Sequence, residues 1–151
     1  MKLGLSMVVK NEEPQISKCL ENLHDLIDDF VVVDTGSTDN TIDVLKQRFG
    51  ARVFSAPPPP DDPYVITHAR NLSLEKNEAD WILVLDADEC IERDQLLQAR
   101  EQLSSGHDAY FLTCGAPIIP SLGLCDAIRV GTDVSGKWED PRDAILLYNP
   151  T

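Results

Sequence analysis

The chain has 151 residues, 42% of them hydrophobic, which suits one globular domain with a central sheet and covering helices and argues against two independent domains. Its 26 acidic residues against 13 lysines and arginines give a formal net charge of −13, which repels a phosphate backbone and argues against nucleic acid as a partner. The sequence has no apolar segment long enough to span a membrane and no signal-peptide core near Met1, so a cytoplasmic location is expected.

Apolar runs and helical patterns alternate along the chain. The expected strands are residues 3–9, 30–33, 52–56, 81–85, 109–113 and 144–148. The helices expected between them cover residues 14–27, 41–49, 64–78 and 94–103. Residues 114–143 are rich in Gly, Pro and Asp and predict a long excursion with one short strand near Ile128. This alternation predicts an α/β fold with a mostly parallel sheet and right-handed crossovers.

Polar residues follow three of the expected strands at the point where each strand ends. They are Lys10-Asn11-Glu12, Asp34-Thr35-Gly36-Ser37 and Asp86-Ala87-Asp88. Because the carboxyl ends of parallel strands share one edge of the sheet, these groups are expected to converge on one crevice.

The pair Asp86 and Asp88 stands at the end of the apolar run that begins at Trp81. Two carboxylates one residue apart repel each other unless a cation lies near them, and a hard divalent ion is the natural candidate. The alternative is an acidic loop that only caps the following helix. The two other polar groups at the same edge favour the metal interpretation.

Four motifs carry a resemblance to a known family. They are Val9 to Glu13 (V-K-N-E-E), Val32 to Thr41 (V-V-D-T-G-S-T-D-N-T), Ala69 to Asn71 (A-R-N) and Trp81 to Glu89 (W-I-L-V-L-D-A-D-E). In this order they resemble family 2 glycosyltransferases of the GT-A fold, over residues 3 to about 100. The resemblance implies a three-layer α/β sandwich that binds a nucleotide-diphosphate sugar.

The resemblance also implies a role for individual residues. Asn11 and Glu12 are expected at the ribose or base, Asp34 at the base, and Lys10 and Arg70 near the phosphates. Asp86 is expected to meet the nucleotide, and Asp88, with Asp86, to bind Mn²⁺ or Mg²⁺ on the diphosphate. The full set expected at the nucleotide sugar is Val9, Lys10, Asn11, Glu12, Asp34, Gly36, Arg70, Asp86 and Ala87.

Two features depart from the family pattern. Thr35 stands where many members have a second acid, which weakens any inference about uracil. The G-x-x-H-E-like segment and the acceptor-side helices of this branch do not appear before Thr151, so no residue matches the family's catalytic base securely. Glu139 and Asp140 are the candidates for that base. We therefore expect one domain, with residues 1–104 as the nucleotide-binding half and 105–151 as a partial acceptor-side half.

The leading hypothesis is metal-assisted, inverting transfer of a sugar to a glycan, lipid, protein or small-molecule acceptor. A second hypothesis is a nucleotide-sugar-binding or accessory module without turnover, because its acceptor half is absent or supplied by another chain. An exposed apolar face in place of the acceptor-side helices would favour a homo-oligomer. A third hypothesis is a phosphatase or nucleotidyltransferase that uses the D-x-D motif directly. For a haloacid-type phosphatase the motif should lie on the first strand, whereas here it follows the fourth.

Overall fold

The computed structural model describes residues 1–59, 61, 63–89, 91–103, 109–113, 128–129 and 144–150. The side chains of Gln102 and of the last three strands are not described. The elements in chain order are β1 (Leu3–Val9), α1 (Glu13–Leu20), the 3₁₀ turn η1 (His24–Leu26), β2 (Asp29–Asp34), α2 (Thr41–Phe49), β3 (Arg52–Ser55), α3 (Val65–Glu75), β4 (Trp81–Val84), α4 (Arg93–Gln102), β5 (Ala109–Thr113), β6 (Ile128–Arg129) and β7 (Ala144–Tyr148).

One sheet runs through the molecule in the order β3-β2-β1-β4-β7-β5-β6. The first four strands along the chain pair in parallel, which confirms the predicted α/β class. β7 lies between β4 and β5 and is antiparallel to both, and β6 is antiparallel to β5. The sequence predicted a strand at residues 144–148 but not its antiparallel direction, because the position that a late strand takes in the sheet depends on long-range pairing that periodicity does not report.

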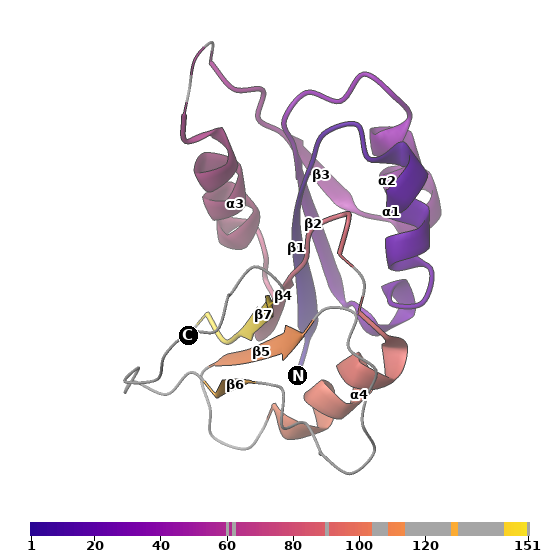
Figure 1. Ribbon diagram of the computed structural model, residues 1–151, viewed down its shortest axis with the longest axis vertical. Helices are drawn as coiled ribbons and strands as arrows, with labels where there is room; N and C mark the ends of the chain where they lie inside the picture. Colours follow the sequence, from indigo (N-terminus) through magenta and orange to yellow (C-terminus); the bar gives the residue numbers. More distant parts are fainter. Residues whose placement is uncertain are drawn as a thin grey trace.

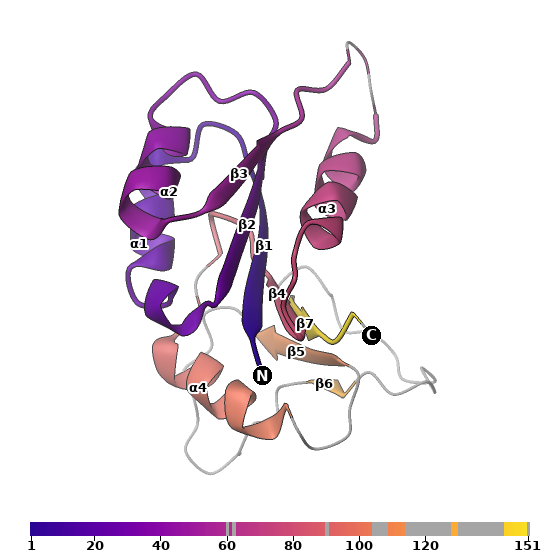
Figure 2. The ribbon, with the colours of Figure 1, turned by 180° about the vertical axis from the view of Figure 1, so that it is seen from behind.

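Helices cover both faces of the sheet (Figures 1 and 2). α1, α2 and α4 lie on one side, and α3 lies on the other. Side chains alternate along β1, so Leu3, Leu5, Met7 and Val9 point into the main core, which includes residues of α1 and α4. α3 packs against the opposite face of β1. In the described part of the chain, no helix has both the length and the apolar character needed to cross a membrane.

The first helix is shorter than its apolar spacing predicts. α1 ends at Leu20, and a turn followed by η1 carries the chain to Leu26. The Leu23 N–H donates to the Leu20 carbonyl at 3.0 Å, and the Leu26 N–H donates to the Leu23 carbonyl at 2.9 Å. All three leucines are buried. Apolar residues three apart lie on the core face in a 3₁₀ turn, as they do in an α-helix. The apolar spacing in the sequence therefore did not show that the α-helix ends at Leu20.

Candidate functional site

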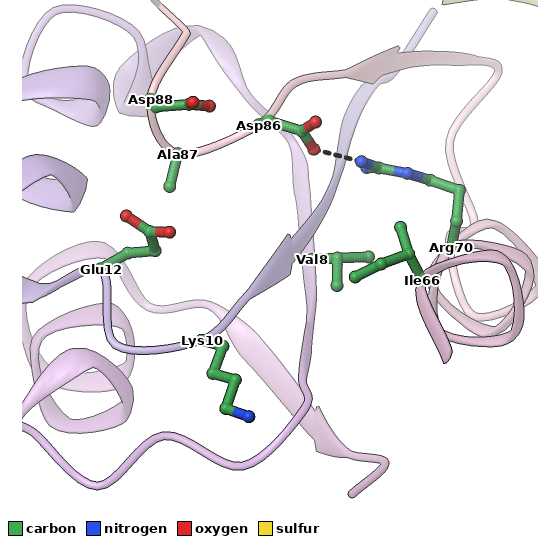
Figure 3. Close-up of a pocket in the computed structure, with 8 residues that line it drawn as sticks. All are labelled: Val8, Lys10, Glu12, Ile66, Arg70, Asp86, Ala87 and Asp88. Atoms are coloured by element: carbon green, nitrogen blue, oxygen red, sulfur yellow. Dashed lines mark hydrogen bonds and ion pairs between the residues drawn. The ribbon is translucent and has the colours of Figure 1, made fainter. Parts of the chain in front are cut away.

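A cavity of about 210 Å³ opens at the carboxyl ends of β1 and β4, beside α3. The residues that line it are Val8, Lys10, Glu12, Ile66, Arg70, Asp86, Ala87 and Asp88 (Figure 3). Six of these eight were predicted from the sequence, and they come from three segments far apart in the chain. The parallel strands and the helix after β3 bring them together, as expected for the edge of such a sheet.

Arg70 holds the first carboxylate of the D-A-D segment. Its Nη2 forms an ion pair with Asp86 Oδ1, and its Nη1 donates to the Ser6 carbonyl at 3.2 Å. The Asp86 N–H donates to Glu89 Oε2 at 2.7 Å. Between the two acids, Ala87 is only 4% exposed. The segment is thus anchored at Asp86 and Ala87, while the Asp88 side chain remains exposed.

Negative charge is concentrated on the side of the cavity that lies opposite Arg70, where Glu12 and Asp88 are found. In the described part of the chain, Asp88 has no hydrogen bond or ion pair, and Figure 3 shows it on the same side as Glu12. Burial raises the pKa of Glu12, and the carboxylates of Asp88, Asp39 and Asp86 raise it further. Burial also raises the pKa of Glu89, although the hydrogen bond from the Asp86 N–H opposes that shift. This side of the cavity is therefore suited to a cation.

The donor set fits a hard divalent ion that brings part of its own coordination shell. Among the residues that the structure describes, no group of three or more His, Cys, Asp or Glu side chains is arranged to hold a metal. Mg²⁺ and ions like it are often bound by one or two carboxylates, with substrate phosphates and waters completing the shell. Asp88 and Asp86 match that arrangement in chemistry and number.

Four predicted site residues do not line the cavity but build the loops around it. Asp34 is 2% exposed, and its carboxylate accepts hydrogen bonds from the N–H groups of Gly36 at 3.0 Å and Ser37 at 3.1 Å. Asn11, at φ 57°, accepts the Thr38 N–H on its Oδ1 at 2.7 Å. Val9 points into the core, and its carbonyl accepts the Thr35 N–H.

Other features of the site were not predicted. Val8 and Ile66 also line the cavity, and Glu89 braces the backbone of Asp86. The spacing of Ile66, four residues before Arg70, was a signal that the two share a face of α3. Glu139 and Asp140, the candidate bases, lie outside the described residues.

A profile of the family described as "Glycosyl transferase family 2" matches residues 5–120. The TPR repeat-containing protein Synpcc7942_0270 of Synechococcus elongatus is 33% identical over 102 residues, which are 68% of this chain and 24% of that protein. The SPbeta prophage-derived glycosyltransferase SunS of Bacillus subtilis is 33% identical over 82 residues, or 54% of this chain and 19% of SunS. The chain thus spans no more than about a quarter of these relatives.

Two solved structures illustrate the similarity of fold. S. aureus TarS 1-349 in complex with UDP matches with a TM-score of 0.60 and 24% identity, over 72% of this chain and 34% of that one. The mannosyltransferase PcManGT from Pyrobaculum calidifontis, in complex with GDP-Man and Mn²⁺, matches with a TM-score of 0.55 and 22% identity, over 72% of this chain and 34% of that one. At this level of identity the likeness establishes the fold, which is the GT-A fold that the motifs implied.

Proposed function

This chain belongs to glycosyl transferase family 2, and on that premise we propose that its acidic cavity is the donor site of a glycosyltransferase, binding a nucleoside-diphosphate sugar together with a divalent cation. The observation that carries the proposal is the convergence of Lys10, Arg70 and the D-A-D carboxylates on one cavity. Two cationic side chains and an exposed carboxylate in one place match a diphosphate and its metal ion.

Individual roles follow from position and chemistry. Lys10 and Arg70 lie where they can meet phosphate oxygens, and Asp88, with Asp86, would hold Mn²⁺ or Mg²⁺. Glu12 is proposed at the ribose or base. When bound, the cation would act as a Lewis acid that stabilises the negative charge on the departing nucleoside diphosphate. Asp34, Asn11 and Gly36 would shape the loop beside the base, with Asp34 contributing through the N–H groups it orients.

We further propose that transfer is inverting and that Glu139 or Asp140 deprotonates the acceptor hydroxyl. In this proposal residues 1–104 form the nucleotide-binding half and residues 105–151 contribute to the acceptor side. The acceptor is a hydroxyl of a glycan, lipid, protein or small molecule. Glu139→Gln and Asp140→Asn should each leave donor affinity unchanged, and the one that removes the base should abolish transfer.

A thermal-shift screen of UDP, GDP and CDP, with and without Mn²⁺, tests donor binding. At least one nucleotide should raise the melting temperature more with Mn²⁺ than without it. Asp88→Asn should remove the contribution of Mn²⁺. Asp80→Asn is the matched control, because it deletes one exposed carboxylate near the opposite end of β4 and should preserve the contribution. If no nucleotide shifts the wild-type protein in the presence of Mn²⁺, the proposed function is wrong.

A nucleotide-sugar-binding module without turnover is the second candidate. It requires only the donor-side residues that line the cavity. The two functions differ in one measurement, the release of nucleoside diphosphate from a bound nucleotide sugar. Binding without release, with or without acceptors, would favour the module.

A further inference from the structure

The face of β1 that meets α3 is small and polar, unlike the apolar face that meets the main core. Gly4, Ser6 and Val8 occupy this face by alternation, and the buried residues of α3 are Ala69 and Ser73. Figures 1 and 2 show α3 as the helix on this side of β1. The seating of α3 against β1 therefore depends on close polar contacts.

Ser6 and Ser73 form the centre of this interface. Both are fully buried, and their hydroxyl groups are hydrogen-bonded to each other. Ser73 Oγ also donates to the Arg70 carbonyl at 2.8 Å. A hydroxyl has one proton, so the Ser6 hydroxyl is the donor to Ser73 Oγ. The resulting chain of hydrogen bonds runs from β1 through Ser73 to the backbone of Arg70.

The backbone of Ser6 ties together both sides of the Arg70–Asp86 ion pair. The Ser6 carbonyl accepts Arg70 Nη1 at 3.2 Å and the N–H of Leu85 at 3.2 Å. Leu85 directly precedes Asp86. Ser6 thus contacts the side chain of Arg70, the helix that carries Arg70 and the strand end that carries Asp86.

Stability alone does not require the hydroxyl pair. Replacing both partners of a buried hydrogen bond with apolar groups of similar shape is close to neutral, so two alanines would serve the packing nearly as well. A fully satisfied buried polar contact instead specifies one arrangement of the elements that it joins. Here the arrangement places the Arg70 guanidinium against Asp86.

We propose that Ser6 and Ser73 are positioning residues of the donor site: they fix α3 on β1 so that Arg70 offsets the charge of Asp86 and holds its carboxylate in place beside Asp88, where the cation and its phosphates would bind. This inference rests on the proposed function. With α3 displaced, Asp86 loses its counter-charge and repels the diphosphate.

Binding of UDP with Mn²⁺, measured by calorimetry, tests the inference. In the wild-type background, the Ser6→Ala/Ser73→Ala double variant should bind about fivefold more weakly, within the range seen for coupled sites. In an Arg70→Lys background the same double variant should change affinity by less than about 1.5-fold, because lysine cannot bridge Ser6 and Asp86 as the guanidinium does. Equal losses in both backgrounds, or no loss in the wild type, would overturn the inference.

Two controls keep the outcome readable. Urea unfolding should give the double variant a stability close to that of the wild type. If the double variant does not fold, Ser73→Cys, which keeps the volume and weakens the hydrogen bonds, is measured in the same way.

NMR of the Arg70 guanidinium needs no ligand. Its rotation should be restricted in the wild type and free in the double variant. If the wild type binds no nucleotide, the proposed function fails, and this spectrum alone decides whether the hydroxyl pair holds Arg70. Unchanged restricted rotation would refute the positioning role.

Discussion

Asp34 is a buried carboxylate whose hydrogen bonds stay within its own turn. Both of its oxygens accept backbone N–H groups, from Gly36 and Ser37, and it is 2% exposed. Asp34→Asn removes the charge and replaces one acceptor oxygen with an N–H₂ donor that faces other donors. We expect a loss of about 2 kcal/mol in the free energy of unfolding, measured in urea, because hydrogen bonds to charged groups contribute more than neutral ones. A loss below about 0.5 kcal/mol would show that the turn does not need the charge.

For individual residues, the sequence predicted which edge of the sheet carries the site, but not which contact each side chain makes there. Lys10, Glu12, Arg70, Asp86 and Asp88 were all placed near one cavity, as expected. Asn11 and Asp34 were also predicted at the nucleotide, and that contact stays a prediction; in the structure their side-chain oxygens accept hydrogen bonds from N–H groups of the loop backbone. Polar residues at strand ends serve both purposes, and only the conformation of the loop decides which.

The position of α3 on β1 is expected to depend on the absence of a side chain at Gly4. A Cβ on Gly4 would lie 2.1 Å from Asn77 Oδ1. Gly4→Ala must therefore displace Asn77, whose Nδ2 donates to the Leu5 carbonyl at 3.0 Å and whose Oδ1 accepts the Ala79 N–H. We expect a loss of about 1–2 kcal/mol in urea unfolding, the typical cost of losing such hydrogen bonds.

The control for this prediction is the same substitution without the clash. In an Asn77→Ala background, Gly4→Ala should cost clearly less, because the displaced side chain is already absent. Equal costs in the two backgrounds would mean that Asn77 moves aside freely and that Gly4 does not set the position of α3.

The tie between α4 and η1 is expected to depend on pH. Arg93 bonds both carboxylate oxygens of Asp25, at 2.6 and 2.7 Å, and this bond to Arg93 lowers the pKa of Asp25 below its ordinary value of 3.8. A lowered pKa stabilises the fold above the unfolded value and ceases to do so as the pH falls through the folded value. Asp25→Asn should therefore lower the melting temperature near neutral pH but not well below about pH 4.

Glu101→Gln is the control for the pH dependence, since it removes an exposed carboxylate from the same helix. It should show no such pH-dependent difference from the wild type. A difference between Asp25→Asn and the wild type that persists in strong acid would contradict the assignment to this ion pair.

The elements divide into those with local signals and those set by distant contacts. β1, β2 and β4 were visible as apolar runs, and Gly50 ends α2 in a left-handed conformation, as a helix-ending glycine should. The break after α1 and the antiparallel entry of β7 were missed. Neither feature has a local sequence signal. The apolar spacing of a 3₁₀ turn resembles that of an α-helix, and the pairing of a strand depends on contacts across the whole sheet.

For the whole molecule, the proposed donor site would have to attract an anion to a protein of net charge −13. Long-range electrostatics oppose a nucleotide, and only local positive charge can reverse this. Lys10 and Arg70 supply part of it, but Arg70 already neutralises Asp86. At the proposed donor site, a nucleoside diphosphate should therefore bind well only together with a cation.

The most direct test of this central claim is the calorimetric affinity of UDP or GDP, measured with and without Mn²⁺, for the wild type, Asp88→Asn and Asp80→Asn. Mn²⁺ should increase the affinity of the wild type and of Asp80→Asn by about tenfold or more, a coupling of roughly 1.4 kcal/mol, and should barely change that of Asp88→Asn. Equal affinity with and without Mn²⁺ in the wild type, or full enhancement in Asp88→Asn, would contradict the account.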